Sequence, residues 1–118
     1  MRKRSVRPVL SDELLDLVAA RFRVLGEPSR LRLVRTLEDG ESNVGELVRR
    51  TGLTQANASR HLQTLTEAGI LGRRKEGLNV IYFIADPDIF ALCDLVCGGL
   101  ERRTARQSRL FAAGRRAS

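Results

Sequence analysis

Residues Thr54 to Leu71 read TQANASRHLQTLTEAGIL, and their pattern indicates the architecture of the chain. Thr54 is suited to cap a helix that runs through Ala68, because its hydroxyl can accept a hydrogen bond from the first turn. Gly69 can then end this helix in a left-handed conformation. Apolar residues recur within it at helical spacing, which predicts one buried side. That side carries Ala58, Leu62 and Leu65.

A shorter helix is expected just before this one, over about residues 44–51, with Leu47 and Val48 facing inward. The tight turn Gly52-Leu53-Thr54 joins the two helices. Two helices connected by a short turn that contains glycine are typical of a helix-turn-helix. The sequence therefore predicts that motif at its centre.

A β-hairpin is expected directly after the second of these helices. Residues 70–75 predict a short strand that ends in charge, and residues 76–79 predict a turn. Residues 80–84 form a run rich in β-branched and aromatic side chains, which favours a second strand. A hairpin in this position would form a wing beside the helix-turn-helix.

Helices are also expected on both sides of this central segment. Residues 11–13 suit the start of a first helix that ends near Gly26, and Ser29 is a candidate N-cap for a second helix. Residues 86–88 suit the start of a last helix that reaches about Leu110. The side chains expected to face inward are Leu14, Leu17, Val18, Phe22 and Leu25 on the first helix, Leu31, Val34 and Leu37 on the second, and Ile89, Leu92, Cys93, Val96, Cys97 and Leu100 on the last.

This order of elements predicts a mainly α protein with a β-hairpin wing, a winged helix-turn-helix. A chain of 118 residues has room for one domain of this kind. We place that domain at residues 11–110, between a basic N-terminal tail at residues 1–10 and a basic C-terminal tail at residues 111–118.

Two blocks of sequence carry a resemblance to a known family. Residues 22–33, FRVLGEPSRLRL, and residues 59–71, SRHLQTLTEAGIL, resemble the opening signature and the recognition helix of the ArsR/SmtB family of bacterial transcriptional repressors. Residues 73–82 resemble the same family's wing, and the similarity extends over about residues 15–100. The resemblance implies a homodimer formed through the first and last helices. Such a dimer would bind double-stranded DNA at an imperfect palindromic operator.

The charge distribution favours DNA as the partner. The net charge is +7. Residues 1–7 carry +4 and residues 101–118 carry +5, while residues 8–100 carry a net charge of −2. Within this acidic body, residues 49–75 carry +5 and coincide with the predicted helix-turn-helix and wing. A total of +7 fits nucleic acid or an anionic membrane, whereas this local concentration favours nucleic acid.

The candidate DNA contacts lie on the second helix of the motif and on the wing. Glutamine and asparagine side chains can pair with adenine and arginine with guanine, while hydroxyls and a helix N-terminus suit phosphate. Basic side chains on the wing would reach phosphates or the minor groove. The candidates are Thr54, Gln55, Asn57, Ser59, Arg60 and His61 on the helix, and Arg73, Arg74 and Lys75 on the wing. For His61, helix packing is an alternative to DNA contact.

The sensor sites that the resemblance implies are not matched by this sequence. Where family members carry a Cys-x-Cys pair, Asn43 and Gly45 stand instead. The Asp/His cluster that binds zinc on the last helix of other members cannot form here, because the chain has one histidine, His61. The remaining candidates are Cys93 and Cys97, four residues apart on the last helix.

Three readings of this cysteine pair stay open. Both thiols could reach one thiophilic atom, such as arsenite, cadmium or another soft metal ion. They could also form a redox or persulfide switch. The third reading is inert packing, because both lie on the apolar stripe of the helix, where cysteine behaves as a small hydrophobic residue. The first two predict a repressor that an inducer releases, and the third predicts a constitutive DNA-binding dimer.

Other classes of protein are disfavoured. The sequence has no phosphate-binding glycine loop and no Ser/His/Asp set, so we expect no enzyme and no cofactor needed for DNA binding. No apolar stretch approaches the length of a membrane span, and no apolar signal core follows the basic N-terminus. We therefore expect a cytoplasmic protein without a membrane partner.

Overall fold

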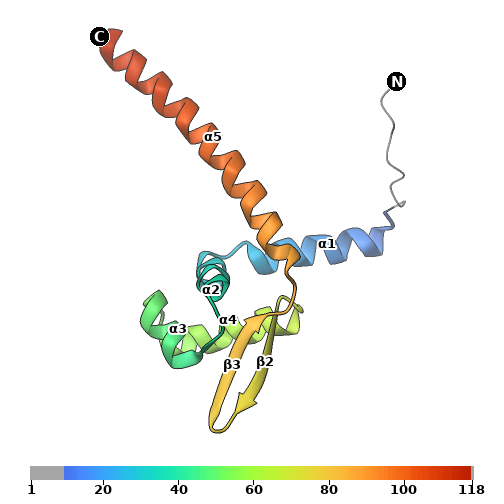
Figure 1. Ribbon diagram of the computed structural model, residues 1–118. Coiled ribbons are helices and arrows are strands. Elements are labelled where there is room, and N and C mark those ends of the chain that lie inside the picture. Colours follow the sequence, from blue (N-terminus) through green and yellow to red (C-terminus); the bar gives the residue numbers. More distant parts are fainter. Residues whose placement is uncertain (1–9, 118) are drawn as a thin grey trace. The chain divides into compact units, whose positions relative to one another are not determined.

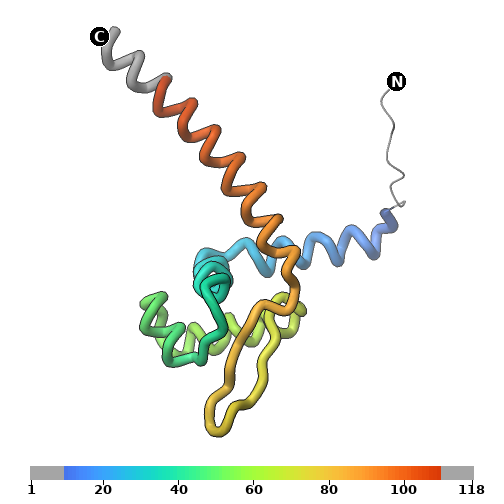
Figure 2. Tube along the Cα trace, viewed as in Figure 1, coloured from blue at the N-terminus to red at the C-terminus, as the bar shows by residue number. Residues whose placement is uncertain are grey.

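The computed structural model describes the backbone of residues 10–117 and the side chains of residues 10–109 (Figures 1 and 2). The chain divides into two compact units, Met1–Ala85 and Asp86–Ser118. The first unit holds α1 (Asp12–Leu25), α2 (Pro28–Glu38), β1 (Ser42–Asn43), α3 (Val44–Thr51), α4 (Gln55–Glu67), β2 (Leu71–Glu76) and β3 (Asn79–Ile84). The second unit holds α5 (Asp88–Ala117). This is the predicted winged helix-turn-helix, and none of the described helices is long and apolar enough to cross a membrane.

Local sequence explains where these helices begin and end. Ser11 and Thr54 accept hydrogen bonds from the first turns of α1 and α4, as expected, and Asn43 does so for α3. The expectation that Ser29 caps α2 is wrong. The carboxylate of Glu27 accepts from the backbone N–H of Arg30 at 3.0 Å, and the helix begins one residue later at Pro28.

The three strands form one antiparallel sheet in the order β1-β3-β2. The wing consists of β2 and β3, in a register that pairs Leu71 with Ile84 and Glu76 with Asn79. The two-residue strand β1, which the sequence did not indicate, pairs with β3 and leads directly into α3. It thereby ties the base of the wing to the helix-turn-helix.

The core of the first unit lies between α2, α3, α4 and the sheet. Its fully buried side chains include Leu33 and Val34 on α2, Leu47 on α3, and Leu62 and Leu65 on α4. Ala58, Ile70 and Leu71 complete it beside α4 and at the start of the wing. The burial of Ala58, Leu62 and Leu65 confirms the predicted inward side of α4. Helical periodicity identifies this face correctly because several elements pack against it.

The prediction for α1 and α2 holds only in part. Leu25 is buried at the end of α1, but Leu14, Leu17, Val18 and Phe22 are exposed, with 68% exposure at Leu17 and 56% at Phe22. On α2, Val34 and Leu37 are buried as expected, whereas Leu31 is exposed. Since periodicity reports an apolar stripe but not what covers it, the exposed stripe of α1 is available to a partner.

The last helix is longer than predicted. It continues past Leu110, where we expected it to end, to Ala117. Of its predicted inward residues, Val96, Cys97 and Leu100 are exposed. The basic N-terminal tail lies outside the described residues except for Leu10.

Candidate nucleic-acid interface

The candidate interface is built first on the N-terminal half of α4. The Thr54 hydroxyl accepts a hydrogen bond from the backbone N–H of Asn57 at 3.2 Å, so this side chain holds the helix start. The backbone N–H groups of the first turn have no acceptor within the helix and, with the helix dipole, favour an anion. Thr54 is therefore placed for capping, and its exposed position also leaves it close to any phosphate bound there.

Four predicted contacts, Gln55, Asn57, Ser59 and Arg60, are exposed on this part of α4. Arg60 donates a hydrogen bond from Nη2 to Oδ1 of Asn57 at 3.0 Å, so the two side chains lie together in the absence of DNA. The pair offers a guanidinium and an amide at adjacent positions, the two groups that recognise guanine and adenine edges. The structure thus brings the predicted base-reading residues to one surface.

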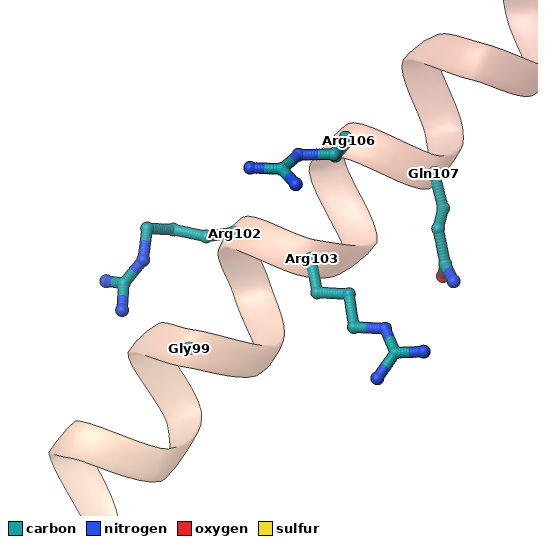
Figure 3. A pocket seen from close by; sticks show the side chains of 5 residues that line it. All are labelled: Gly99, Arg102, Arg103, Arg106 and Gln107. Atoms are coloured by element: carbon teal, nitrogen blue, oxygen red, sulfur yellow. The ribbon is translucent and has the colours of Figure 1, made fainter.

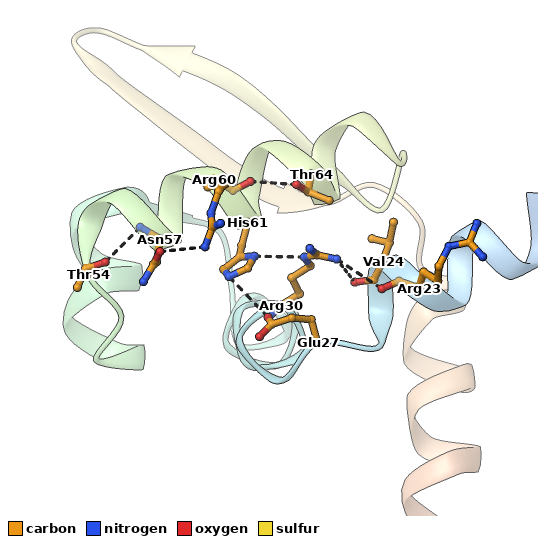
Figure 4. A network of polar contacts seen from close by, with 9 residues as sticks. All are labelled: Arg23, Val24, Glu27, Arg30, Thr54, Asn57, Arg60, His61 and Thr64. Carbon is orange, nitrogen blue, oxygen red and sulfur yellow. Dashed lines mark hydrogen bonds and ion pairs between the residues drawn. The ribbon is translucent and has the colours of Figure 1, made fainter.

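His61 does not belong to this surface. It is 8% exposed and lies on the same face of α4 as Ala58 and Leu65, turned toward α2 (Figure 4). Its Nδ1 accepts a hydrogen bond from Nε of Arg30 at 3.2 Å, and its Nε2 lies 3.6 Å from Oε2 of Glu27. The expected DNA contact by His61 is therefore corrected to helix packing, the alternative given for this residue.

Arg30 connects three helices through this network. Besides His61 on α4, its Nη1 donates to the carbonyl of Val24 at 2.9 Å and reaches that of Arg23 at 3.5 Å (Figure 4). These carbonyls belong to the last turn of α1, where backbone oxygens have no partner within the helix. The sequence analysis did not single out Arg30. In the sequence, Arg30 is one of several arginines that lie between apolar residues of α2. This pattern does not show whether an arginine is exposed to solvent or bridges two helices.

The wing presents Arg73 and Lys75 to solvent. Both lie on the face of β2 that begins with buried Leu71, because side chains alternate along a strand. Leu71 anchors this face beside α4, and the two cations continue it toward the tip of the wing. Both are exposed, and their contact with phosphate stays a prediction.

Arg74 lies on the opposite face of β2 and is bound to acidic residues. Its Nη1 and Nη2 donate to the two carboxylate oxygens of Glu41 at 2.8 and 2.7 Å, and its Nε donates to Glu76 at 2.8 Å. The guanidinium carbon also lies 5.7 Å from the centre of the Phe83 ring. The predicted phosphate contact by Arg74 is therefore corrected: two carboxylates compensate its charge, and its geometry joins the wing to the residue preceding β1.

These contacts change the ionisation of the pair. The hydrogen bond from Arg74 lowers the pKa of Glu41 below its ordinary value of 4.5, against a smaller opposing effect of desolvation. The same hydrogen bond and one from Glu76 raise the pKa of Arg74. Glu41 therefore stays ionised to lower pH than an isolated glutamate.

The local charge is less basic than the sequence suggested. Three of the six cations in residues 49–75 face carboxylates that lie just outside that segment: Arg49 pairs with Glu46, Arg50 with Asp39, and Arg74 with Glu41 and Glu76. The other three are Arg60, Arg73 and Lys75, all predicted DNA contacts. The tertiary structure thus concentrates the available positive charge on α4 and one face of the wing.

The two cysteines lie one helical turn apart on α5. Cys93 is half-buried, Cys97 is exposed, and neither forms a disulfide. Within the described part of the chain, no group of three or more His, Cys, Asp or Glu side chains is arranged to hold a metal ion. A third ligand for an ion at these thiols would have to come from outside one described chain.

Further along α5 the surface is strongly basic. Arg102, Arg103, Arg106 and Gln107 project from adjacent turns (Figure 3). Arg102 passes close to Gly98, where an added Cβ would lie 3.4 Å from its Nη1.

Known helix-turn-helix proteins are similar to this chain in both sequence and structure. Residues 25–74 match a family model described as a helix-turn-helix domain. The chain is 39% identical over 83 residues to the HTH-type transcriptional regulator Rv0081 of Mycobacterium tuberculosis, a match that covers 70% of this chain and 73% of that relative. The crystal structure of M. tuberculosis Rv0081 is similar with a TM-score of 0.75 and 35% identity, covering 82% of this chain and 98% of that chain.

Two further solved structures are similar. One is the homodimeric winged helix-turn-helix DNA-binding domain of Mb0332 from Mycobacterium bovis, described as a possible ArsR-family transcriptional regulator. Its TM-score is 0.71 at 31% identity, over 83% of this chain and 91% of that one. The other is the antimony-specific transcriptional repressor AntR, with a TM-score of 0.73 at 28% identity, over 84% of this chain and 90% of that one.

Proposed function

Because the chain belongs to the ArsR/SmtB family of winged helix-turn-helix transcriptional regulators, we propose that it is a homodimeric repressor released from DNA by a thiophilic inducer. The dimer binds an imperfect palindromic operator through α4 and the wing. The inducer, arsenite or another soft metal ion or reactive sulfur, reacts at Cys93 and Cys97. The family is a class of DNA-binding regulators and not of enzymes.

One observation carries the DNA-binding part of this proposal. The exposed polar residues at the N-terminal half of α4 and the exposed cations of the wing belong to one packed unit, in which Leu71 at the base of the wing is buried. Arg60 and Asn57 are suited to base edges, and Arg73 and Lys75 to phosphates. In a dimer, two such units reach half-sites about one helical turn apart.

The exposed apolar side chains of α1 and α5 support the dimer. Leu17 and Phe22 on α1, and Val96 and Leu100 on α5, are more than half exposed in the single chain. Several exposed apolar side chains on one helix usually mark a protein–protein interface, and each of the two helices carries such a set. The similar Mb0332 domain is homodimeric, which agrees with a second copy of this chain as the partner.

The placement of the thiols supports the inducer. Cys97 is exposed, so it can react with a solute, and Cys93 lies about 6 Å along the helix axis, close enough for both sulfurs to bind one atom. With arsenous acid, each thiol displaces one hydroxyl, which leaves as water with the thiol proton. The similar AntR is an antimony-specific repressor, and antimony has the same preference for sulfur.

A constitutive DNA-binding dimer is the second candidate. Both cysteines share the apolar stripe of α5 with Val96 and Leu100, where inert thiols would serve only as small apolar side chains. For release, the inducer must distinguish two states of the dimer by differential affinity, and a coupling of about 1–3 kcal/mol suffices. Inert cysteines provide no such coupling.

An operator-release titration tests the proposal. A duplex selected by the parent protein from a random-sequence pool is bound, and arsenite, cadmium and a polysulfide donor are added separately to the parent, Cys93→Ser and Cys97→Ser proteins. We expect at least one of these reagents to release the parent and neither variant. Release of neither the parent nor the variants by any reagent supports the constitutive dimer, and the absence of any selected sequence contradicts DNA recognition itself.

A further inference from the structure

Leu78 at the tip of the wing has a relative exposure of 105%, so the remainder of the chain covers none of it. Among the described residues of the first unit, the other large apolar side chains that are exposed are Leu31 on α2 and residues on or just before α1. The α1 residues belong to the proposed dimer surface. Leu78 lies on a different element, and that surface does not account for it.

The turn itself does not require leucine. Glu76 pairs with Asn79, which leaves Gly77 and Leu78 as a two-residue loop. Gly77 has a φ of +63°, whereas no described residue other than glycine has a positive φ. Positive φ at the first loop residue alone is the pattern of a type II′ turn, which specifies glycine there and leaves the next position open. A polar residue would close this hairpin equally well.

The surroundings of Leu78 are suited to a polyanion. Lys75 is exposed on the same hairpin. Leu78 and Asn79 also line a hollow of about 370 Å³ whose opposite side, at α3, carries Arg49. The apolar tip is thus flanked by the exposed cation Lys75 and an amide, whereas Arg49 is paired with Glu46 and the carboxylate of Glu76 is engaged by Arg74.

We propose that Leu78 enters the minor groove of the operator beside the groove read by α4, and there acts as an apolar wedge that bends the duplex. This inference rests on the proposed DNA-binding function. An α4 in the major groove brings the wing over the adjacent backbone, and the next groove on that side is a minor groove. Apolar side chains inserted between base steps in the minor groove unstack them and kink the duplex.

An apolar contact with DNA can be distinguished from a phosphate contact by the salt dependence of binding. A phosphate contact releases counterions, so its loss reduces the salt dependence of binding. An apolar wedge contributes affinity by burial, so its loss lowers affinity at every salt concentration and leaves that dependence unchanged. Burial of one leucine side chain corresponds to roughly tenfold or more in affinity.

The experiment compares the full-length parent protein with Leu78→Ala, Leu78→Met and Arg73→Ala on a duplex that the parent selects from a random pool. Affinity is measured across a salt series, and bending is measured by energy transfer between dyes at the duplex ends. We expect Leu78→Ala to bind roughly tenfold more weakly with the parent's salt slope and a smaller bend. Leu78→Met should retain affinity and bend, and Arg73→Ala should reduce the salt slope.

Because Leu78 is fully exposed, its replacement leaves the fold unchanged, and thermal unfolding of each variant without DNA verifies this. Equal affinity and bend for the parent and Leu78→Ala would overturn the wedge while leaving the proposed DNA-binding function intact. A reduced salt slope in Leu78→Ala, or a shift in its oligomeric state without DNA, would also overturn it. A parent protein that binds no duplex contradicts the DNA-binding function itself.

Discussion

Nε of Arg30 donates a hydrogen bond to Nδ1 of His61 over 3.2 Å, and this bond joins the start of α2 to the buried face of α4. Since arginine can only donate, Nδ1 of His61 carries no proton, and the hydrogen of the neutral ring lies on Nε2, toward Glu27. The guanidinium also reaches the last carbonyls of α1. The helix that bears the base-reading residues is thus tied to the first helix by a polar network.

Replacement of His61 by alanine should destabilise the fold by about 2 kcal/mol, because it leaves Nε of the half-buried Arg30 without its acceptor. Chemical denaturation measures the change in the free energy of unfolding. Ser59→Ala, an exposed neighbour on α4, is the control and should change it by less than about 0.5 kcal/mol. A His61→Ala protein with the parent's stability but weakened DNA binding would restore the sequence-based assignment of His61 to the interface.

Replacement of Gly72 by alanine should weaken the wing. Gly72 pairs with Phe83 across the hairpin, and an added Cβ would lie 2.5 Å from the Phe83 ring, which itself contacts Arg74. We expect a loss of about 1–3 kcal/mol in the free energy of unfolding. Gly45→Ala in α3 is the matched control. There the nearest atom would be 3.5 Å away, so that variant should be unchanged or slightly more stable.

Replacement of Glu41 by glutamine should make the wing more basic, because Arg74 then has only Glu76 as a charged partner. We expect tighter DNA binding with a steeper salt dependence, measured by titration of a duplex across a salt series. Glu38→Gln, an acidic residue paired with Arg35 on α2, serves as the comparison of equal charge. An equal gain in both variants would show that net charge, and not the position on the wing, is responsible.

The stability that Glu41 contributes should depend on pH. Its folded-state pKa is lowered by Arg74, so the contribution is present above its ordinary pKa of 4.5 and is lost as the pH falls through the lower folded-state value. The difference in stability between the parent and Glu41→Gln should therefore be constant near neutral pH and disappear in acid. Thermal unfolding over a pH series measures it, and a difference that grew in acid would contradict the Arg74 contact.

Substitution of each wing cation should show, through the salt dependence of DNA binding, that Arg73 and Lys75 contact DNA and that Arg74 does so less. Because the proposed dimer carries two copies of each residue, Arg73→Ala and Lys75→Ala should each reduce the slope of log affinity against log salt by about 2, whereas Arg74→Ala should change it less. The reason is that Arg74 is already neutralised by Glu41 and Glu76. Equal slope changes for all three would return Arg74 to the interface.

A charge on the exposed face of α1 should dissociate the dimer. Phe22→Glu places a carboxylate within the apolar stripe that we assign to the second copy, and sedimentation should show a shift toward monomer. Asp16→Ala, on the polar side of the same helix, should leave the association unchanged. If Phe22→Glu sediments like the parent, α1 is not part of the interface.

The sequence alone determined the helix-turn-helix, the hairpin and which of their polar side chains are exposed. Helix caps such as Thr54, the left-handed Gly69 and apolar periodicity act within a few residues of the chain, so local rules locate α3, α4 and the hairpin closely. The exposed residues Gln55, Asn57, Ser59, Arg60, Arg73 and Lys75 were also identified from the motif. Their exposure follows from the side of each element that the apolar pattern leaves free.

Only the tertiary structure determined which polar side chains bind other residues of the same chain and which are left free at the surface. Arg74 and Arg73 are neighbours with the same charge, yet strand alternation turns one toward Glu41, which lies 33 positions away in the sequence. His61 and Arg30 meet across a separation of 31 positions. No local rule specifies such partners, because an ion pair or hydrogen bond depends on distances that only the packing of α2, α4 and the sheet establishes.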